Sequence, residues 1–349
     1  MKTFDLYRRV AIQSVQRDKN LEVLCYAWQT SSHDETWPSW IPRWDIHMLQ
    51  ENEMVVLPFL YGASQHRSIE YGFSPDRNTL LLRGVNIGAV ANPSTNFAYQ
   101  APSVEDPDSC DSAIENQLRF MSTLITHDRW QDGDFEETSA ARSQHHAQAQ
   151  FAGFSAYVLP LLKQHDEDCF MSLAVGTWCE FCNEDFTPLK GETAIKPPDV
   201  YHCYICADGS YDICEFCYSQ GSRCEVSCHV LKKVTVGTMS IPRSERVMNI
   251  LEKHAPTGDG ELFRTLISTT TRGAMFFSVS QRWRGAASCA IEHGDVIAIL
   301  FGSRVPCILR RYGSAYRLVS TCYVQDFMDG EAIEMLEHGE LQSEMFEIT

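Results

Sequence analysis

The feature that most constrains this chain is a run of closely spaced cysteines between positions 179 and 229. Eight of the fourteen cysteines in the 349-residue sequence lie there, six of them in three C-x-x-C pairs. In order, the run holds Cys179, Cys182, Cys203, Cys206, Cys214, Cys217, Cys224, Cys228 and His229. Two sulfurs three residues apart can turn toward one ion, and tetrahedral Zn²⁺, with Zn–S distances of about 2.3 Å, needs four ligands. The three pairs with Cys224 and His229 therefore predict two complete zinc sites, and Cys228 is an alternative to His229 as the eighth ligand.

Disulfide bonds and a redox centre are the alternatives to zinc. A disulfide framework is typical of short secreted chains in an oxidising compartment, and a redox motif of a single C-x-x-C pair. The sequence begins M-K-T-F-D-L, with charges where the apolar core of a secretory signal would lie. No apolar run approaches the roughly 18 residues that span a bilayer. We therefore expect a soluble, intracellular protein without membrane contact, in the cytoplasm or alternatively the nucleus, that binds two Zn²⁺ ions.

The segment Y-D-I-C-E-F-C, from Tyr211 to Cys217, resembles the core of the ZZ-type zinc finger. The resemblance implies a cross-braced arrangement, with the first and third C-x-x-C pairs on one zinc. The other zinc would then be held by Cys203, Cys206, Cys224 and His229. The spacing by itself does not show which pairs share an ion. Fingers of this type hold peptide N-termini through acidic groups, and the local candidates are Asp208, Asp212 and Glu215. The family commonly ends in two histidines, whereas Cys224 stands at the first of these positions here.

Charge argues against nucleic acid as a partner. The chain has 29 Lys and Arg against 46 Asp and Glu, a formal net charge of −17. Nucleic-acid binding normally needs a basic face. We therefore expect a protein or peptide partner.

Two further segments resemble fungal heterokaryon-incompatibility (HET) family proteins. L-E-V-L-C-Y followed by W-P-S-W-I-P-R-W-D, within residues 21–45, is similar to the segment that follows their N-terminal domain. Motifs of their C-terminal region are matched at 294–302 (G-D-V-I-A-I-L-F-G), 305–310, 316–324 and 328–332. The N-terminal HET domain's own W-x-D-x-x-C-I-N-Q-like pattern is absent, so the chain resembles the C-terminal region alone. The resemblance implies a role in self/non-self recognition.

Local patterns predict a mixed fold. We expect an amphipathic helix over 3–16 with Leu6, Tyr7, Val10 and Val15 on its apolar side, and a strand over 79–90 with a bulge at Gly84. Further helices are expected from Ser112, from 138 as far as Pro160, and near 244–254; short strands fill 274–324. Trp37, Trp40 and Trp44 are expected to be packing elements.

The expected fold class is α+β: a small antiparallel β-sheet or barrel with flanking helices, plus an inserted cross-braced two-zinc finger. Four segments are predicted: 1–92 (N-terminal helix, Trp/Pro segment and a strand that packs on the β-rich region), 93–175 (linker and helical segment), 176–234 (the finger) and 235–349 (helix and β-rich region).

Catalytic motifs are absent from the sequence. It contains no G-x-S-x-G, G-x-x-x-x-G-K-[ST], H-E-x-x-H or G-x-G-x-x-G. Four protein ligands close each predicted zinc site, which leaves no position for a metal-activated water. We therefore expect a non-enzymatic interaction scaffold. The alternatives are a ubiquitin-ligase-like cross-braced module that recruits a conjugating enzyme, and a gene fragment without a selected function.

Overall fold

The chain divides into two compact units, which are described separately below. The computed structural model describes residues 3–27, 37–44, 61–94, 96–98, 111, 114–115, 118–119, 121–122, 139–164, 169–172, 179–183, 199–203, 211–224, 226, 231–235, 238–241, 243–263, 274–279, 283–288 and 290–349. Unit 1 comprises Met1–Ser94 and Met275–Thr349, and unit 2 comprises Thr95–Ala274. Unit 2 is thus an insertion between two parts of the sequence that fold together. The four-segment division expected from the sequence stays a prediction.

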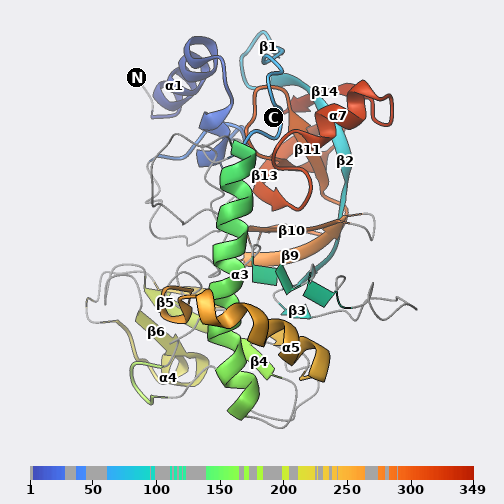
Figure 1. The fold of residues 1–349 in the computed structure, drawn as a ribbon. Helices are drawn as coiled ribbons and strands as arrows, with labels where there is room; N and C mark the ends of the chain where they lie inside the picture. Colours follow the sequence, from blue (N-terminus) through green and yellow to red (C-terminus); the bar gives the residue numbers. More distant parts are fainter. Residues whose placement is uncertain are drawn as a thin grey trace. The chain divides into compact units, whose positions relative to one another are not determined.

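Unit 1 is built on a large, mostly antiparallel sheet whose strand order closes on itself (Figure 1). Its strands are β1 (Tyr71–Phe73), β2 (Leu80–Ser94), β9 (Ala274–Val279), β10 (Trp283–Ser288), β11 (Val296–Leu300), β12 (Cys307–Tyr312), β13 (Ala315–Val324) and β14 (Ser343–Ile348). The order is β1-β2-β11-β12-β13-β10-β9, β9 pairs back onto β2, and β14 joins β13 to β2. The expectation of a mixed fold with an antiparallel sheet is confirmed, but the sheet is large, with eight strands, whereas a small one was expected.

Strand β2 holds this sheet together because it pairs with four other strands. Leu80–Val85 face β14, Gly84–Ala89 face β11, and the last residues pair with β9. Gly84 lies in regular register opposite Leu300, and the irregularity falls between Ile297 and Ala298 of β11, opposite Asn86–Gly88. The bulge predicted at Gly84 is therefore two to four residues further along, where Gly88 has a φ of 140°.

The sheet is apolar on both faces because each face packs a separate core. Along β11, Val296, Ala298 and Leu300 face one core, and Ile297 and Ile299 face the other. The first core is completed by α1 (Thr3–Asp18), the 3₁₀ helix η1 (Glu22–Tyr26) and Trp40. The second core is completed by α7 (Glu331–Glu337).

Trp40 is fully buried and donates to the Asn78 carbonyl at 2.9 Å, which confirms its predicted packing role. Trp37 is half-buried and Trp44 is exposed.

The packed face of α1 agrees with the predicted one at Tyr7 and Val15 but not at Leu6 and Val10. Ala11, Ile12 and Val15 are buried, whereas Leu6 and Val10 are exposed. Apolar periodicity alone did not fix the rotation of this helix, because its apolar residues are spread over a wide arc. Aromatic contacts from Phe4 and Tyr7 to Trp37 orient it instead.

Unit 2 contains two helices that pack side by side, α3 (Ser139–Gln164) and α5 (Glu245–His254), the latter followed by the 3₁₀ helix η5 (Ala255–Thr257). Ser244 caps α5 by accepting a hydrogen bond from Val247 N, in agreement with the predicted start. Helix α3 was expected to end at Pro160 but continues to Gln164. A proline inside a helix costs one backbone hydrogen bond and is tolerated where tertiary packing compensates; buried Val158 and Leu162 flank it here.

A helical stretch around Ile114, Leu118 and Met121 buries these three residues and falls where a helix was expected from Ser112. Two three-stranded sheets complete unit 2. One orders β3 (Asn96–Ala98), β8 (Thr238–Ile241) and β4 (Cys169–Ser172); the other orders β6 (Tyr211–Cys214), β5 (Asp199–Cys203) and β7 (Lys232–Thr235). Within the residues that the structure describes, no helix is long and apolar enough to cross a membrane.

Candidate metal centre

The β6-β5-β7 sheet and the short helix α4 (Glu215–Ser219) form the frame of the candidate site. All four residues of β6 are buried, and Val200 and Ile213 pack with the cysteines in one cluster. The rings of Tyr201 and Tyr218 stack at 3.5 Å between centroids, which joins β5 to α4. This small frame fixes where β6 ends and α4 begins.

The first C-x-x-C pair lies in a tight turn. Asn183 N donates to the Cys179 carbonyl at 2.8 Å, and Asn183 has a φ of 55°, a left-handed conformation that asparagine tolerates better than most residues. Glu180 N donates to the Asp212 carbonyl at 3.0 Å, so the turn is attached to β6. The turn therefore carries Cys179 and Cys182 to the end of that strand.

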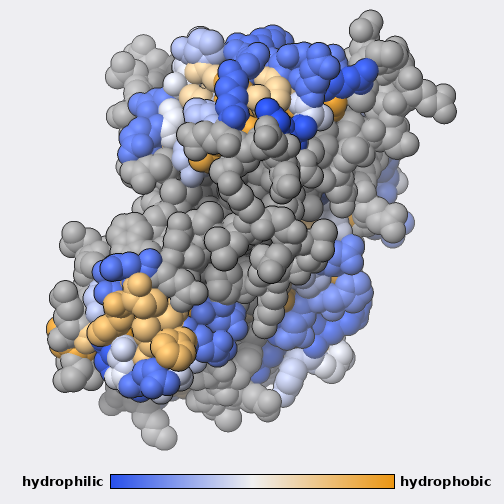
Figure 2. All heavy atoms as spheres, turned by 90° about the horizontal axis from the view of Figure 1, so that it is seen from below, coloured by the Kyte–Doolittle hydropathy of each residue, from blue (hydrophilic) through white to orange (hydrophobic). Residues whose placement is uncertain are grey.

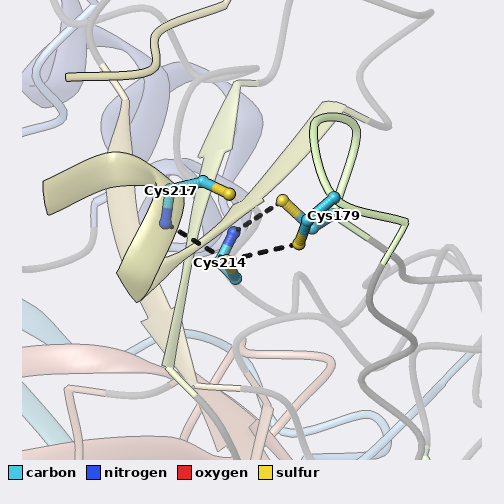
Figure 3. A group of neighbouring side chains, drawn as sticks. Cys179, Cys214 and Cys217 are labelled. Atoms are coloured by element: carbon cyan, nitrogen blue, oxygen red, sulfur yellow. Dashed lines mark hydrogen bonds between the residues drawn. The ribbon is translucent and has the colours of Figure 1, made fainter. Parts of the chain in front are cut away.

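The second pair spans the junction of β6 and α4. Cys214 is the N-cap of α4, and its sulfur accepts from Cys217 N at 3.3 Å. Cys214 N in turn donates to the Cys179 sulfur at 3.4 Å. The two turns are thus joined to each other through sulfur as well as through the backbone (Figure 3).

The four sulfurs of Cys179, Cys182, Cys214 and Cys217 converge on one point. All lie within 4.8 Å of one another, and Cys182 Sγ is 3.8 Å from Cys214 Sγ. A tetrahedron with Zn–S bonds of about 2.3 Å has S···S edges of about 3.8 Å, so this arrangement has the size that a single metal ion requires. Three of the cysteines are buried and Cys182 is exposed. This group of four cysteines can hold a metal ion.

The thiol pKa values differ within the group. Burial raises the pKa of Cys179, but the N–H groups of Cys214, Cys182 and Phe181 outweigh it and lower that pKa to about 7. For Cys214 and Cys217 burial is the largest cause, and the pKa of each is raised. Adjacent thiolates repel one another, so a bound cation is what would stabilise all four in the charged state.

The second predicted zinc site is only partly described. Cys203 and Cys224 are buried in the same apolar cluster as the four-cysteine group, and the Cys224 thiol donates to the Val226 carbonyl at 3.3 Å. Cys206, Cys228 and His229 lie outside the described residues. The second site, and the choice between Cys228 and His229, stay predictions.

The three predicted peptide-binding residues have different environments. Asp212 is buried, with a fractional exposure of 2%. Glu215 is exposed, and its carboxylate lies 3.1 Å from the Lys233 ammonium, which also lies 3.1 Å from Asp199. Asp208 lies outside the described residues. Of the described pair, only Glu215 presents its carboxylate to solvent, and the binding role of all three stays a prediction. No motif in the sequence indicates that Asp199 and Lys233 belong to this surface.

The fold and this site define a protein of mixed helix and strand, with a large antiparallel sheet and a four-cysteine group that can hold a metal ion. No protein-family model, no curated protein and no solved structure matches the chain.

Proposed function

We propose that this protein is a zinc-binding, non-enzymatic interaction scaffold. The observation that carries the proposal is the convergence of four cysteine sulfurs from two C-x-x-C turns within 4.8 Å. Four thiolates in a tetrahedral arrangement favour Zn²⁺ or an iron–sulfur centre, and Zn²⁺ is the usual ion where a small cross-braced fold surrounds the ligands. Because four protein ligands fill the coordination sphere, the ion would be structural and would hold the two turns together.

A second Zn²⁺ ion is part of the proposal, held by Cys203, Cys206, Cys224 and His229. The burial of Cys203 and Cys224 next to the first group supports it. The spacing of these residues, and the resemblance of the segment to a ZZ-type finger, also favour this assignment.

A protein or peptide segment is the proposed partner, in keeping with the resemblance to the C-terminal region of HET-family proteins and its implied role in self/non-self recognition. The net charge of −17 disfavours nucleic acid as the partner. A non-enzymatic role is favoured because closed zinc coordination leaves no position for a reacting water.

The metal content of the purified full-length chain tests the zinc assignment. Elemental mass spectrometry is expected to find two zinc ions per chain, one lost in Cys214→Ser and the other in Cys203→Ser. Cys25→Ser is a matched control, since Cys25 is equally buried but lies in unit 1. Iron in place of zinc would change the identity of the proposed metal ion. A chain that contains no metal and whose mass shows disulfide bonds would overturn the proposal.

The interaction role is tested with the zinc-loaded chain. Binding to free-amine peptides but not to acetylated ones would assign an N-terminus as the ligand, through Asp208, Asp212 or Glu215. Ubiquitin transfer to the chain itself in the presence of purified activating and conjugating enzymes would instead support the ligase-like alternative.

A further inference from the structure

The two turns of the metal centre repeat the same four residues. Residues 179–182 and 214–217 both read C-E-F-C, so each turn places a glutamate and a phenylalanine between two metal-ligand positions. Phe181 is 50% exposed and Phe216 is 70% exposed. The exposure of these two rings has a geometric cause. The sulfurs turn inward toward a common point, so the side chains between them are directed away from it.

These exposed rings require an explanation. A buried phenylalanine contributes about 1.5–3 kcal/mol to folding, and isolated exposed apolar side chains are common on protein surfaces. Phe181 and Phe216 are not isolated, because each is bonded to ligands whose sulfurs lie within 4.8 Å of one another. Two large apolar side chains thus occupy equivalent positions in the two turns of one centre, and exposed aromatic residues are enriched where proteins bind partners.

Acidic groups border both rings. Glu180 is exposed beside Phe181, and Glu215 is exposed beside Phe216. Among the described residues, two cations lie near the rings: Lys233 is shared between Glu215 and Asp199 at 3.1 Å from each, and Arg223 is exposed and lies over the Tyr218 ring. The surface is therefore apolar at the two rings, and the carboxylates around them (Glu180, Glu215 and Asp199) outnumber these two cations. On the face of the molecule that Figure 2 draws, apolar patches lie among hydrophilic residues.

This combination selects among partners. An anionic membrane surface, a nucleic acid and a second copy of a chain with net charge −17 would each bring negative charge to an acidic surface. A basic segment with apolar side chains complements both the rings and the carboxylates.

We propose that Phe181 and Phe216, bordered by Glu180 and Glu215, form the docking surface for a protein segment in which an aliphatic or aromatic residue is flanked by Lys or Arg. The inference rests on the proposed interaction function and names its surface and the chemistry of its partner. The metal ion would act indirectly, by holding the two turns so that both rings present to the same partner.

The test selects a displayed library of random short peptides on the metal-loaded full-length chain, followed by affinity measurement of the enriched peptides. Enriched peptides are expected to carry an apolar residue next to Lys or Arg, and to bind more weakly as salt concentration rises. Phe181→Ser/Phe216→Ser is expected to weaken their binding at least about tenfold, as the loss of a central aromatic contact does. Met345→Ser, at another exposed apolar residue on β14, should leave their affinity unchanged.

A second variant keeps the test decisive if the serine substitutions disturb the turns. Glu180→Lys/Glu215→Lys keeps both rings and is expected to weaken the same basic peptides. Metal content is measured for every variant. Enrichment of acidic peptides, no enrichment, or full binding to both double variants would overturn this docking surface. Zinc-dependent binding that survives in both variants would leave the proposed function standing, whereas a wild-type chain without metal would remove that function itself.

Discussion

Asp295 and Arg310 form a two-pronged ion pair at the start of β11 and within β12. Arg310 Nε donates to Asp295 Oδ1 and Arg310 Nη2 to Asp295 Oδ2, each at 2.9 Å. Asp295 is buried, and its carboxylate also accepts from Glu292 N at 2.7 Å. The two residues come from two separate sequence segments, G-D-V-I and V-P-C-I-L-R. The contact gives these two separate patterns one physical role: together they fix the β11–β12 hairpin.

Removing the carboxylate should therefore destabilise unit 1. Asp295→Ala removes the acceptor of the Glu292 N–H and the bidentate acceptor of the Arg310 guanidinium, which keeps the Ala290 carbonyl and the Glu292 carboxylate. Loss of one partner of a buried ion pair costs about 3–5 kcal/mol. Because Arg310 is partly exposed and also contacts Glu292, we expect the lower end of that range. Urea unfolding followed by tryptophan fluorescence measures the change. Glu292→Ala, which removes an exposed contact to the same arginine, should cost less than about 1 kcal/mol; an equal loss for the two variants would contradict this account.

Gly84 is a second position where unit 1 should be sensitive. A Cβ at Gly84 would lie 2.6 Å from the Ile299 carbonyl oxygen and 3.0 Å from Leu300 Cα, both backbone atoms of β11 that cannot rotate away. Gly84→Ala should lower the free energy of unfolding by about 1–3 kcal/mol, the usual cost of overpacking. Gly62→Ala is the control, since a Cβ there meets nothing within 4 Å. It should be neutral or stabilising by up to about 1 kcal/mol.

The sequence predicted those parts of the fold that local residue patterns determine. Strands β9 to β13 fall within 274–324, where short strands were expected, and the turns at Gly302 and Gly313, both with positive φ, separate β11, β12 and β13. The helix expected near 244–254 is α5, whose N-cap is Ser244, and the C-x-x-C spacing predicted the two turns that the structure joins in one centre. In each case one residue or one short spacing decides the local geometry.

The long-range pairing of strands could not be predicted from the sequence, for a physical reason. The alternation of buried and less buried residues along β2 indicates which side of the strand is buried but not which strands lie beside it, and one of its partners, β14, lies about 260 positions away. The division into a unit formed by the two ends of the chain and an inserted unit depends on that pairing. The exposure of Phe181 and Phe216 could have been suspected from the repeated C-E-F-C, but the direction of each ring required the structure.

Glu115 should make the stability of unit 2 depend on pH. It accepts from Arg119 at 2.7 Å and lies 3.4 Å from the Lys253 ammonium and 3.2 Å from His254 Nε2, so it links the stretch around Ile114 to α5. Burial raises the pKa of Glu115, but Arg119, His254 and Lys253 outweigh it, and that pKa lies below its usual value. The carboxylate therefore stabilises the fold above the unfolded pKa, and this contribution is lost as pH falls through the lower folded value.

Glu115→Gln tests this dependence. The variant should be less stable than wild type by about 1 kcal/mol at pH 7, and the difference should shrink as both proteins are acidified below about pH 4. Glu252→Gln, which removes an exposed contact to Lys163, should change stability by less than about 0.5 kcal/mol at any pH. A difference between Glu115→Gln and wild type that stays constant down to pH 3 would show that charge is not the cause.

Metal removal should unfold the β6-β5-β7 sheet while leaving unit 1 intact. The three strands have four or five residues each, and a sheet of that size buries too little apolar surface to be stable by itself. Binding of structural zinc to comparable peptides is worth about 10–16 kcal/mol, which would supply the missing stability.

Hydrogen exchange followed by mass spectrometry on the full chain, with and without a chelator, measures this loss of structure directly. Peptides covering 199–219 should lose protection on chelation, while those covering β11–β13 keep it. The variant Cys214→Ser should show the same local loss without chelator, and Cys25→Ser should not. Equal protection of 199–219 with and without metal would mean that the apolar cluster of Val200 and Ile213 is sufficient to hold the cysteines in place.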